Sequence, residues 1–244
     1  MLILKLNPVS FRFMVADISD NDLVCPLSTV LSTGPFDTKG MTKLAMKQSS
    51  FAWTTATSLE VRDELLTLLC QVAYQEGDFL LSSGQRSTYY INGKQVTLHP
   101  QGALAVGRVL LDIIPMNTVA VAGLTLGADP IVTATSVVAA YEGRSLTALI
   151  VRKEAKGHGT QVYIEGPTLP EGAPVVVLED VVTTGQSAMK AVERLRAAGY
   201  IVTQVMTLVD RQQGGAEYYA SQGIEFQAVY TIEDLQRRWK ELHG

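Results

Sequence analysis

Two adjacent carboxylates, Glu179 and Asp180, are the residues of this chain best placed to do chemistry. They directly follow an uninterrupted apolar run at 175–178, which is typical of a β-strand that is buried on both faces. We expect this strand to end at the acid pair and to leave both carboxylates at the edge of a sheet. Carboxylate oxygens accept hydrogen bonds, so the pair is suited to hold the hydroxyl groups of a diol.

The segment after the acid pair has the composition of an anion-binding loop. It reads VVTTGQS at 181–187 and leads into a helical pattern, so hydroxyl groups, a glycine and free backbone N–H groups meet at a helix N-terminus. Such a junction favours a phosphate dianion without the help of a lysine. The alternative is a solvated turn whose threonines only cap the next helix.

A second segment, RKEAKGHG at 152–159, is a cluster of cations with a single acid. From 152 to 172 apolar periodicity is weak, and a stretch of that length in a compact domain is commonly a functional lid or a disordered segment. An ordinary solvated surface is the alternative. The cationic residues of this segment are Arg152, Lys153, Lys156 and His158.

The elements that must position these groups form an alternating series. Two early helices are expected, one capped by Thr57 and Glu60 and one that begins near Pro100. The order that follows predicts βαβ units and a parallel sheet covered on both faces, with ligands at the carboxyl ends of its strands. Strand-like apolar runs lie at 118–123, 146–151, 174–180, 201–210 and 225–230, and helical patterns lie at 128–141, 186–198 and 231–242.

The composition indicates one globular domain with an N-terminal extension. The chain has 244 residues, 47% of them hydrophobic, and a net charge of -4, which argues against general nucleic-acid binding. Two cysteines without CxxC spacing support neither a disulfide framework nor a zinc site, and no apolar run is long enough to span a membrane. We therefore expect a cytoplasmic protein. Residues 1–56 lack periodicity and contain repeated proline and glycine, so we expect a poorly ordered extension before a domain at 57–244.

Four segments carry a resemblance to a known family. VVVLEDVVTTGQS at 175–187 resembles the thirteen-residue PRPP-binding signature of type I phosphoribosyltransferases. RKEAKGHG resembles the flexible catalytic loop of orotate phosphoribosyltransferases, and FLLSSGQRSTYYIN at 79–92 and VDRQQG at 209–214 resemble the base-recognition segments of that family. Because all four motifs occur in the expected order, the binding interpretation of each is favoured over its alternative.

The resemblance implies a role for each matched residue. The ribose hydroxyls are held by Glu179 and Asp180, and the 5′-phosphate is bound by Thr183, Thr184, Gly185 and Ser187. The same PRPP-binding segment includes Val181, Val182 and Gln186. The pyrophosphate is contacted by Arg152, Lys153, Lys156 and His158, and the residues expected to act in catalysis are Arg152, Lys156, His158 and Asp180. Orotate is bound by Arg211, whose planar guanidinium can donate to two oxygens, together with Ser83, Gly84, Tyr90 and Thr183.

The resemblance also implies the fold, the reaction and the partners. We expect an α/β protein with the type I phosphoribosyltransferase fold, a central mainly parallel sheet flanked by helices, and a small hood built largely from 78–95. The expected reaction joins orotate to PRPP and gives orotidine 5′-monophosphate and pyrophosphate in pyrimidine (UMP) biosynthesis. Mg²⁺ is the expected cofactor, carried by PRPP with Asp180 as the candidate protein contact, and a homodimer with shared active sites is the expected assembly.

The chain departs from the family pattern at two positions, and two other functions stay open. Some members have lysine immediately before the Ser-Gly pair, where this chain has Ser82. A phosphoribosyltransferase for a purine or another base is one alternative, and a PRPP-sensing regulator without catalysis is the other. An ion pair with Asp210 is the alternative role of Arg211. The loop at 122–134 also lacks a lysine that some members have, and its candidates for backbone donation are Thr125, Gly127 and Ala128.

Overall fold

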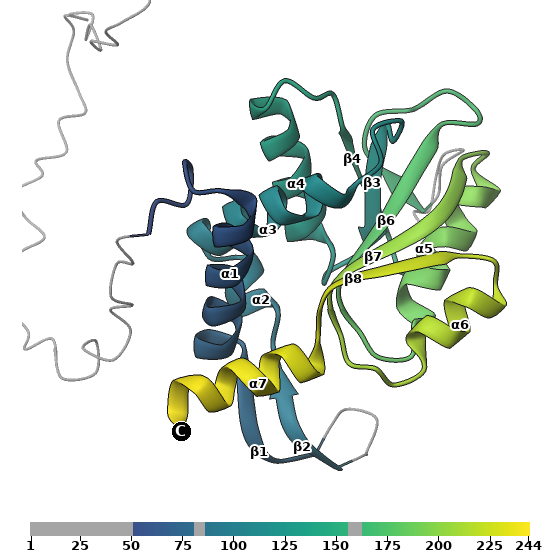
Figure 1. The fold of residues 1–244 in the computed structure, drawn as a ribbon. Coiled ribbons are helices and arrows are strands. Elements are labelled where there is room, and N and C mark those ends of the chain that lie inside the picture. Colours follow the sequence, from purple (N-terminus) through teal and green to yellow (C-terminus); the bar gives the residue numbers. More distant parts are fainter. Residues whose placement is uncertain (1–50, 81–85, 156–162) are drawn as a thin grey trace, which may run out of the picture. The chain divides into compact units, whose positions relative to one another are not determined.

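The computed structural model describes residues 51–80, 86–155 and 163–244, which belong to one compact unit, Ser50–Gly244. The centre of this unit is a six-stranded sheet in the spatial order β5-β4-β3-β6-β7-β8 (Figure 1). All neighbouring strands are parallel except β4 and β5, which confirms the mainly parallel sheet predicted from the sequence. The strands are β3 (Ala120–Leu124), β4 (Thr147–Val151), β5 (Ile164–Glu165), β6 (Pro174–Val182), β7 (Ile201–Asp210) and β8 (Glu225–Thr231).

Helices cover both faces of this sheet (Figure 1). Along β6, Val176 and Leu178 belong to the apolar core shared with α1, α3, α4 and α7, whereas Val175 and Val177 belong to the core shared with α5. Successive strand residues point to opposite faces, so both faces of β6 are buried, as its unbroken apolar run indicates. The helices are α1 (Ser58–Val72), α2 (Lys94–Thr97), α3 (Pro100–Ile113), α4 (Asp129–Tyr141), α5 (Gln186–Ala197), α6 (Gly215–Ser221) and α7 (Ile232–His243).

The first helix begins with the predicted capping box. The Thr57 hydroxyl accepts a hydrogen bond from the Glu60 N–H at 3.3 Å, and the Glu60 carboxylate accepts one from the Thr57 N–H at 2.8 Å. The chain already packs before this cap, because Trp53 is buried and its carbonyl accepts a hydrogen bond from Arg108 of α3 at 2.6 Å. The compact unit therefore begins several residues earlier than the boundary placed at Thr57. Residues 1–50 of the expected extension lie outside the described residues.

An antiparallel hairpin of β1 (Tyr74–Leu80) and β2 (Arg86–Ile91) forms a separate two-stranded sheet (Figure 1). Its aromatic residues pack on the C-terminal helix α7, since the Tyr74 ring lies 5.4 Å from the Trp239 ring and 6.0 Å from the Tyr89 ring. The hairpin and the turn into α2 also reach residues at the carboxyl ends of β6 and β7, as described below. This hairpin is the hood that the sequence predicts.

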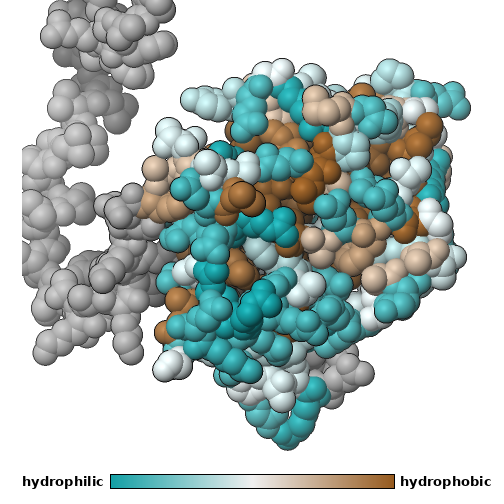
Figure 2. All heavy atoms as spheres, viewed as in Figure 1, coloured by the Kyte–Doolittle hydropathy of each residue, from teal (hydrophilic) through white to brown (hydrophobic). Residues whose placement is uncertain are grey.

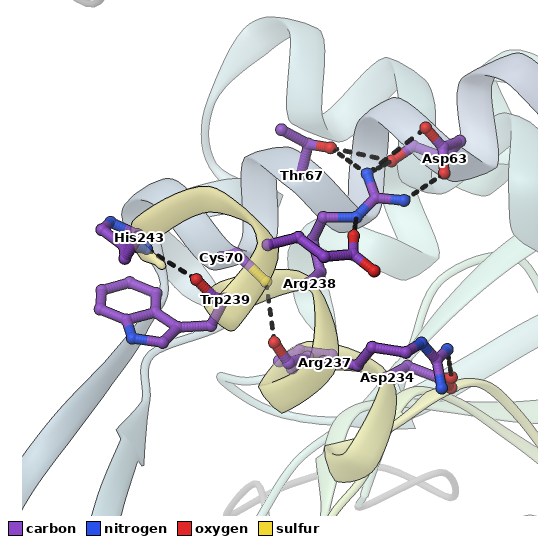
Figure 3. Close-up of polar contacts among 10 residues, drawn as sticks. Asp63, Thr67, Cys70, Asp234, Arg237, Arg238, Trp239 and His243 are labelled. Atoms are coloured by element: carbon purple, nitrogen blue, oxygen red, sulfur yellow. Dashed lines mark hydrogen bonds and ion pairs between the residues drawn. The ribbon is translucent and has the colours of Figure 1, made fainter.

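Polar contacts fix α7 to α1, as Figure 3 shows. Arg238 forms an ion pair with Asp63 and donates a hydrogen bond to the Thr67 hydroxyl at 2.5 Å. The Cys70 thiol donates to the Leu235 carbonyl at 3.3 Å, and burial raises its pKa to about 12. Cys70 is therefore a neutral packing residue. Through α7, these contacts hold the hairpin in place on the domain.

The structure corrects one boundary that bears on the site. β6 does not end at the acid pair but runs to Val182, because Val181 and Val182 pair with Val209 and Asp210 of β7. The carboxylates therefore lie within the last part of a strand. The elements α2, β5 and α6 were not predicted, because segments of 4, 2 and 7 residues carry too little periodicity. Within the described residues, no helix is long and apolar enough to cross a membrane.

Candidate active site

The acid pair lies in the last part of β6, which is still paired with β7 on one side but no longer with β3 on the other. β3 pairs with β6 only as far as Ala122 and Val177, whereas β7 pairs with β6 as far as Val182. Glu179 and Asp180 lie beyond that point and are only 6% and 8% exposed. Two adjacent buried carboxylates are unfavourable in an ordinary core, so their presence indicates a functional site.

Two glycines take up positions against these carboxylates. A Cβ atom on Gly127, in the loop after β3, would lie 2.8 Å from Asp180 Oδ1 and 3.3 Å from Glu179 Oε1. A Cβ atom on Gly93, between β2 and α2, would lie 3.3 Å from Asp180 Oδ2. Backbone from the hood and from the β3 loop therefore approaches the acid pair closely. A side chain at position 127 would require the Asp180 carboxylate to shift.

The loop after β6 folds around a small polar cavity of about 90 Å³. Gly185 adopts a left-handed conformation with φ of 82° and is the N-cap of α5, so the unpaired N–H groups of the first helical turn follow it directly. Such a helix N-terminus attracts an anion. The cavity is lined by Glu179, Val181, Val182, Thr183, Thr184, Gly185, Gln186, Ser187, Ala188 and Tyr219.

Glu179 is electrostatically the most perturbed acid of this cluster. Its Oε1 accepts a hydrogen bond from the Asp180 N–H at 3.3 Å, whereas Oε2 is buried and has no hydrogen-bond partner in the described part of the chain. Burial, followed by the negative charge of Asp180, raises the pKa of Glu179 well above its ordinary value. The positive charge of Lys153 lowers this pKa, so the Lys153 ammonium is within electrostatic reach of the acid pair. Glu179 thus retains an oxygen able to accept a hydrogen bond from a bound hydroxyl group.

Arg211 follows β7 and lies beside the loop after β6. Its backbone N–H donates to the Val182 carbonyl at 2.9 Å, and its Nη1 donates to the Thr183 hydroxyl at 3.5 Å. Its Nε donates to the Tyr89 hydroxyl at 3.3 Å, with the guanidinium 4.9 Å from the centre of the Tyr89 ring. Nη2 is buried and, among the described residues, has no acceptor. The arrangement leaves one donor of a fixed guanidinium for a ligand.

The neighbours of Arg211 differ in part from those expected. Within the described residues Asp210 forms no ion pair with Arg211, and its carboxylate instead accepts a hydrogen bond from a backbone N–H at 2.8 Å. On the hairpin, Tyr89 rather than Tyr90 contacts Arg211, because successive strand residues point to opposite faces. Tyr90 is 42% exposed and packs on an aromatic neighbour within the hairpin.

The basic segment begins at the carboxyl end of β4, and its first cations are described. Arg152 forms an ion pair with Glu165 of β5 at 3.0 Å. Arg194 of α5 donates to the carbonyl oxygens of Arg152 and Lys153, the latter at 2.8 Å. The Arg194 guanidinium also lies over the Tyr163 ring, 4.2 Å from its centre. Arg194 therefore ties the start of the basic segment, and Tyr163 beyond it, to the helix that follows β6.

The structure brings most of the predicted site residues together, but some positions fall outside its description. Three residues that sequence reasoning did not single out belong to the cluster: Gly93, Arg194 and Tyr219. Gly93 has a weak signal in the Asn-Gly pair that ends the hairpin. Arg194 and Tyr219 have no signal in the sequence, because their partners are distant along the chain. Outside the described residues lie Ser83, Gly84, Lys156 and His158.

Comparison with known proteins gives a consistent result. The orotate phosphoribosyltransferase of a Nostoc species is 71% identical over 198 residues, which cover 81% of this chain and 96% of the relative. That of a Synechocystis species is 65% identical over 190 residues, with coverages of 78% and 96%. The orotate phosphoribosyltransferase of Mycobacterium tuberculosis, solved in complex with PRPP, is 34% identical with a TM-score of 0.60, and the match covers 72% of this chain and 99% of that one. Adenine phosphoribosyltransferase from Leishmania donovani, at 15% identity and a TM-score of 0.52, shares the fold. No family model matches the chain.

Proposed function

This chain belongs to the orotate phosphoribosyltransferase family, and from that membership we propose how its residues divide the work of the reaction. The enzyme transfers the 5-phosphoribosyl group from PRPP to orotate and releases pyrophosphate, a step of pyrimidine biosynthesis. One observation carries the assignment of residues: a buried acid pair leads into an anion-binding loop beside an arginine with a free donor. Identity of this level argues against the purine-using enzyme and the PRPP-sensing regulator.

The junction after β6 binds the ribose phosphate part of PRPP. Glu179 and Asp180 accept hydrogen bonds from the ribose hydroxyls, which is supported by the free, buried Oε2 of Glu179. The 5′-phosphate occupies the polar cavity, where the first turn of α5 supplies N–H groups and Thr183, Thr184 and Ser187 supply hydroxyl groups.

Arg211 binds orotate. Its guanidinium is oriented by Tyr89 and Thr183, so Nη2 is available to an oxygen of the carboxylate or of the adjacent carbonyl of the base. Thr183 belongs to the phosphate-binding loop and contacts this arginine, which places the base next to the ribose. The assignments of Ser83, Gly84 and Tyr90 rest on the sequence motif.

The basic segment receives the pyrophosphate. As the bond between ribose C1 and pyrophosphate breaks and the bond from C1 to the ring nitrogen of orotate forms, pyrophosphate gains negative charge and C1 gains positive charge. Cations at the leaving group lower the barrier, and the carboxylates beside the ribose oppose the charge on C1. No general base is required, because the reacting nitrogen of orotate loses its proton readily. The cations assigned to pyrophosphate are Arg152, Lys153, Lys156 and His158, the last two from the sequence motif alone.

Mg²⁺ fits this site as a partner of PRPP rather than of the protein alone. No group of three or more His, Cys, Asp or Glu side chains able to hold a metal ion occurs among the described residues. The oxygens of Glu179 and Asp180 are of the kind that Mg²⁺ prefers, and Mg²⁺ is usually held by one or two carboxylates together with substrate phosphates. Asp180 is the candidate protein ligand. Bound with PRPP, Mg²⁺ would neutralise part of the charge of the departing pyrophosphate.

A cytoplasmic location and a homodimer with shared active sites complete this proposal. An apolar groove supports the dimer. Figure 2 shows apolar side chains gathered on the face over α3 and α4. A groove of about 610 Å³ lies there, and Leu98 and Val137 on its walls are 68% and 63% exposed. Continuous exposed apolar surface marks an interaction site. The wall at Asp129 and Pro130 is adjacent in sequence to the loop that contacts Asp180, so a second copy on this groove would border the acid pair.

The proposed reaction is tested by following the loss of orotate absorbance with PRPP and Mg²⁺, beside parallel assays with adenine, hypoxanthine and uracil. We expect turnover of orotate only. In Arg211→Ala the KM for orotate should rise roughly tenfold or more, because a hydrogen bond between charged groups is lost, while the KM for PRPP changes little. Absence of orotate turnover by folded protein contradicts the reaction, and an unchanged KM for orotate in the variant removes Arg211 from the base site.

A further inference from the structure

Tyr219 of α6 has a polar atom without an evident structural use. The residue is fully buried and belongs to the lining of the phosphate-loop cavity, yet its hydroxyl has no hydrogen-bond partner among the described residues. Buried hydroxyl groups are nearly always hydrogen-bonded, and an unpaired one destabilises the fold. The ring packs 5.0 Å from the Phe226 ring, a contact that phenylalanine would make equally well. The hydroxyl therefore requires an explanation outside packing.

The surroundings of Tyr219 hold its phenol end against the phosphate-binding loop. A Cβ atom on Gly185 would lie 2.9 Å from Tyr219 Cζ, so the hydroxyl-bearing carbon is next to the left-handed glycine that begins α5. A Cβ atom on Gly215, at the start of α6, would lie 2.5 Å from the Val182 side chain. With glycine at both contacts, α6 packs closely on the loop. Tyr219 cannot turn its hydroxyl away without disturbing this packing.

The electrostatic setting makes the Tyr219 hydroxyl a donor. Burial, and then the negative charges of Glu179 and Asp210, raise the pKa of Tyr219 far above its ordinary value, so the proton stays on the oxygen. Besides Glu179 and Gln186, the polar side chains of the cavity carry hydroxyl groups, and the N–H groups of a helix N-terminus lie beside them. A cavity whose hydrogen-bonding groups converge as donors is suited to an anionic acceptor.

We propose that the Tyr219 hydroxyl donates a hydrogen bond to the phosphate group that occupies this cavity and thereby contributes to PRPP affinity. The proposal rests on the assignment of the cavity to the 5′-phosphate made above. It adds to the phosphate subsite a donor from α6, an element outside the signature loop. Among the described residues the hydroxyl has no partner, and in the complex the phosphate would supply one.

Tyr219→Phe tests this donor because it removes one oxygen and keeps the ring. The matched control is Tyr218→Phe, which removes a hydroxyl from the adjacent, half-buried tyrosine of the same helix. The full-length variants are compared for affinity toward PRPP and inorganic phosphate by calorimetry, and for melting temperature with and without PRPP. In Tyr219→Phe we expect roughly tenfold weaker binding of both ligands, an unchanged KM for orotate, and a melting temperature of the free protein that is equal or higher. Tyr218→Phe should match the wild type in each measurement.

Three results would overturn the proposal. The first is unchanged affinity of Tyr219→Phe for PRPP and phosphate. The second is a lower melting temperature of the free protein with an undiminished PRPP-induced shift, which would mean that the hydroxyl is bonded within the fold. The third is an equal loss of affinity in Tyr218→Phe. Failure of the proposed function is seen separately, as absence of orotate turnover by the wild-type protein.

Discussion

The phosphate-binding loop after β6 and the basic segment after β4 belong to one sheet but are held in different ways. The first continues a strand that pairs with β7 as far as Val182, and it passes into a helix at Gly185. The second leaves the sheet with exposed residues and is fixed by side chains, through Arg194 and the ion pair of Arg152 with Glu165. Groups assigned to the retained ribose phosphate are thus built into the backbone of the fold. Groups assigned to the leaving pyrophosphate are attached to the fold by side-chain contacts that a single substitution can remove.

The largest effect is expected from a substitution of Asp180, which lies in the part of the site that is built into the backbone of β6. Asp180→Asn keeps the shape of the side chain but removes its charge, so kcat/KM should fall by about two to three orders of magnitude. The melting temperature should not fall, because the repulsion between two buried carboxylates is relieved. Steady-state kinetics and thermal unfolding measure the two effects, with the exposed Asp112→Asn as control. Activity within a fewfold of the wild type would show that the acid pair is structural.

A smaller effect is expected from a substitution of Arg194, whose side chain holds the start of the basic segment. Arg194→Met removes the hydrogen bonds to the carbonyls of Arg152 and Lys153, so kcat/KM for PRPP should fall by roughly tenfold through misplacement of the cations. Arg196→Met is a matched control from the same helix, because Arg196 donates to the Val202 carbonyl at 2.6 and 3.0 Å, away from the site. Both variants should lose similar stability, and only Arg194→Met should lose activity. Equal kinetics in the two variants would contradict a positioning role for Arg194.

The smallest effect concerns the pH dependence of stability. The pKa of Glu179 is raised in the folded protein, chiefly by burial, so folding favours its protonated form. The contribution of Glu179 to the free energy of unfolding should be largest at acidic pH and should fall as the pH rises from the ordinary carboxyl pKa through the raised one. Glu179→Gln removes this dependence. Melting temperatures of both proteins from acidic to alkaline pH, without Mg²⁺, should therefore diverge in favour of the variant as pH rises, and parallel curves would show that Glu179 is not perturbed.

Periodic and local signals predicted the frame of the molecule well. The capping box at Thr57, the helix that begins at Pro100 and the unbroken apolar run of β6 each depend on neighbouring residues, so the sequence displays them directly. The end of β6 was placed wrongly, because its last residues are kept in the strand by pairing with β7, which is distant in sequence. Long-range pairing of this kind leaves no local pattern.

The candidate site shows the same difference between local motifs, which are visible in the sequence, and long-range contacts, which are not. The acid pair and the loop to Ser187 were predicted, because they form one continuous motif. Tyr90 was the tyrosine of the hairpin assigned to the base, whereas Tyr89 contacts Arg211, because the face of the hairpin that meets Arg211 is decided only by its packing on the sheet. Arg194 and Tyr219 act on the loops from separate helices, so no spacing in the sequence relates them to the motifs they support.

The close fit of Gly127 against Asp180 has a consequence for how this sequence can change over time. A lysine at position 127 would displace the acid pair, because its first side-chain atom would lie 2.8 Å from an Asp180 oxygen and that carboxylate would have to shift. The other oxygen of this carboxylate faces Gly93, where an added Cβ atom would lie 3.3 Å away, so a shift toward that side depends on the glycine being kept. Lineages that carry a lysine there and lineages that carry a glycine should therefore differ together at the positions around Asp180, and a one-residue graft between them should fail.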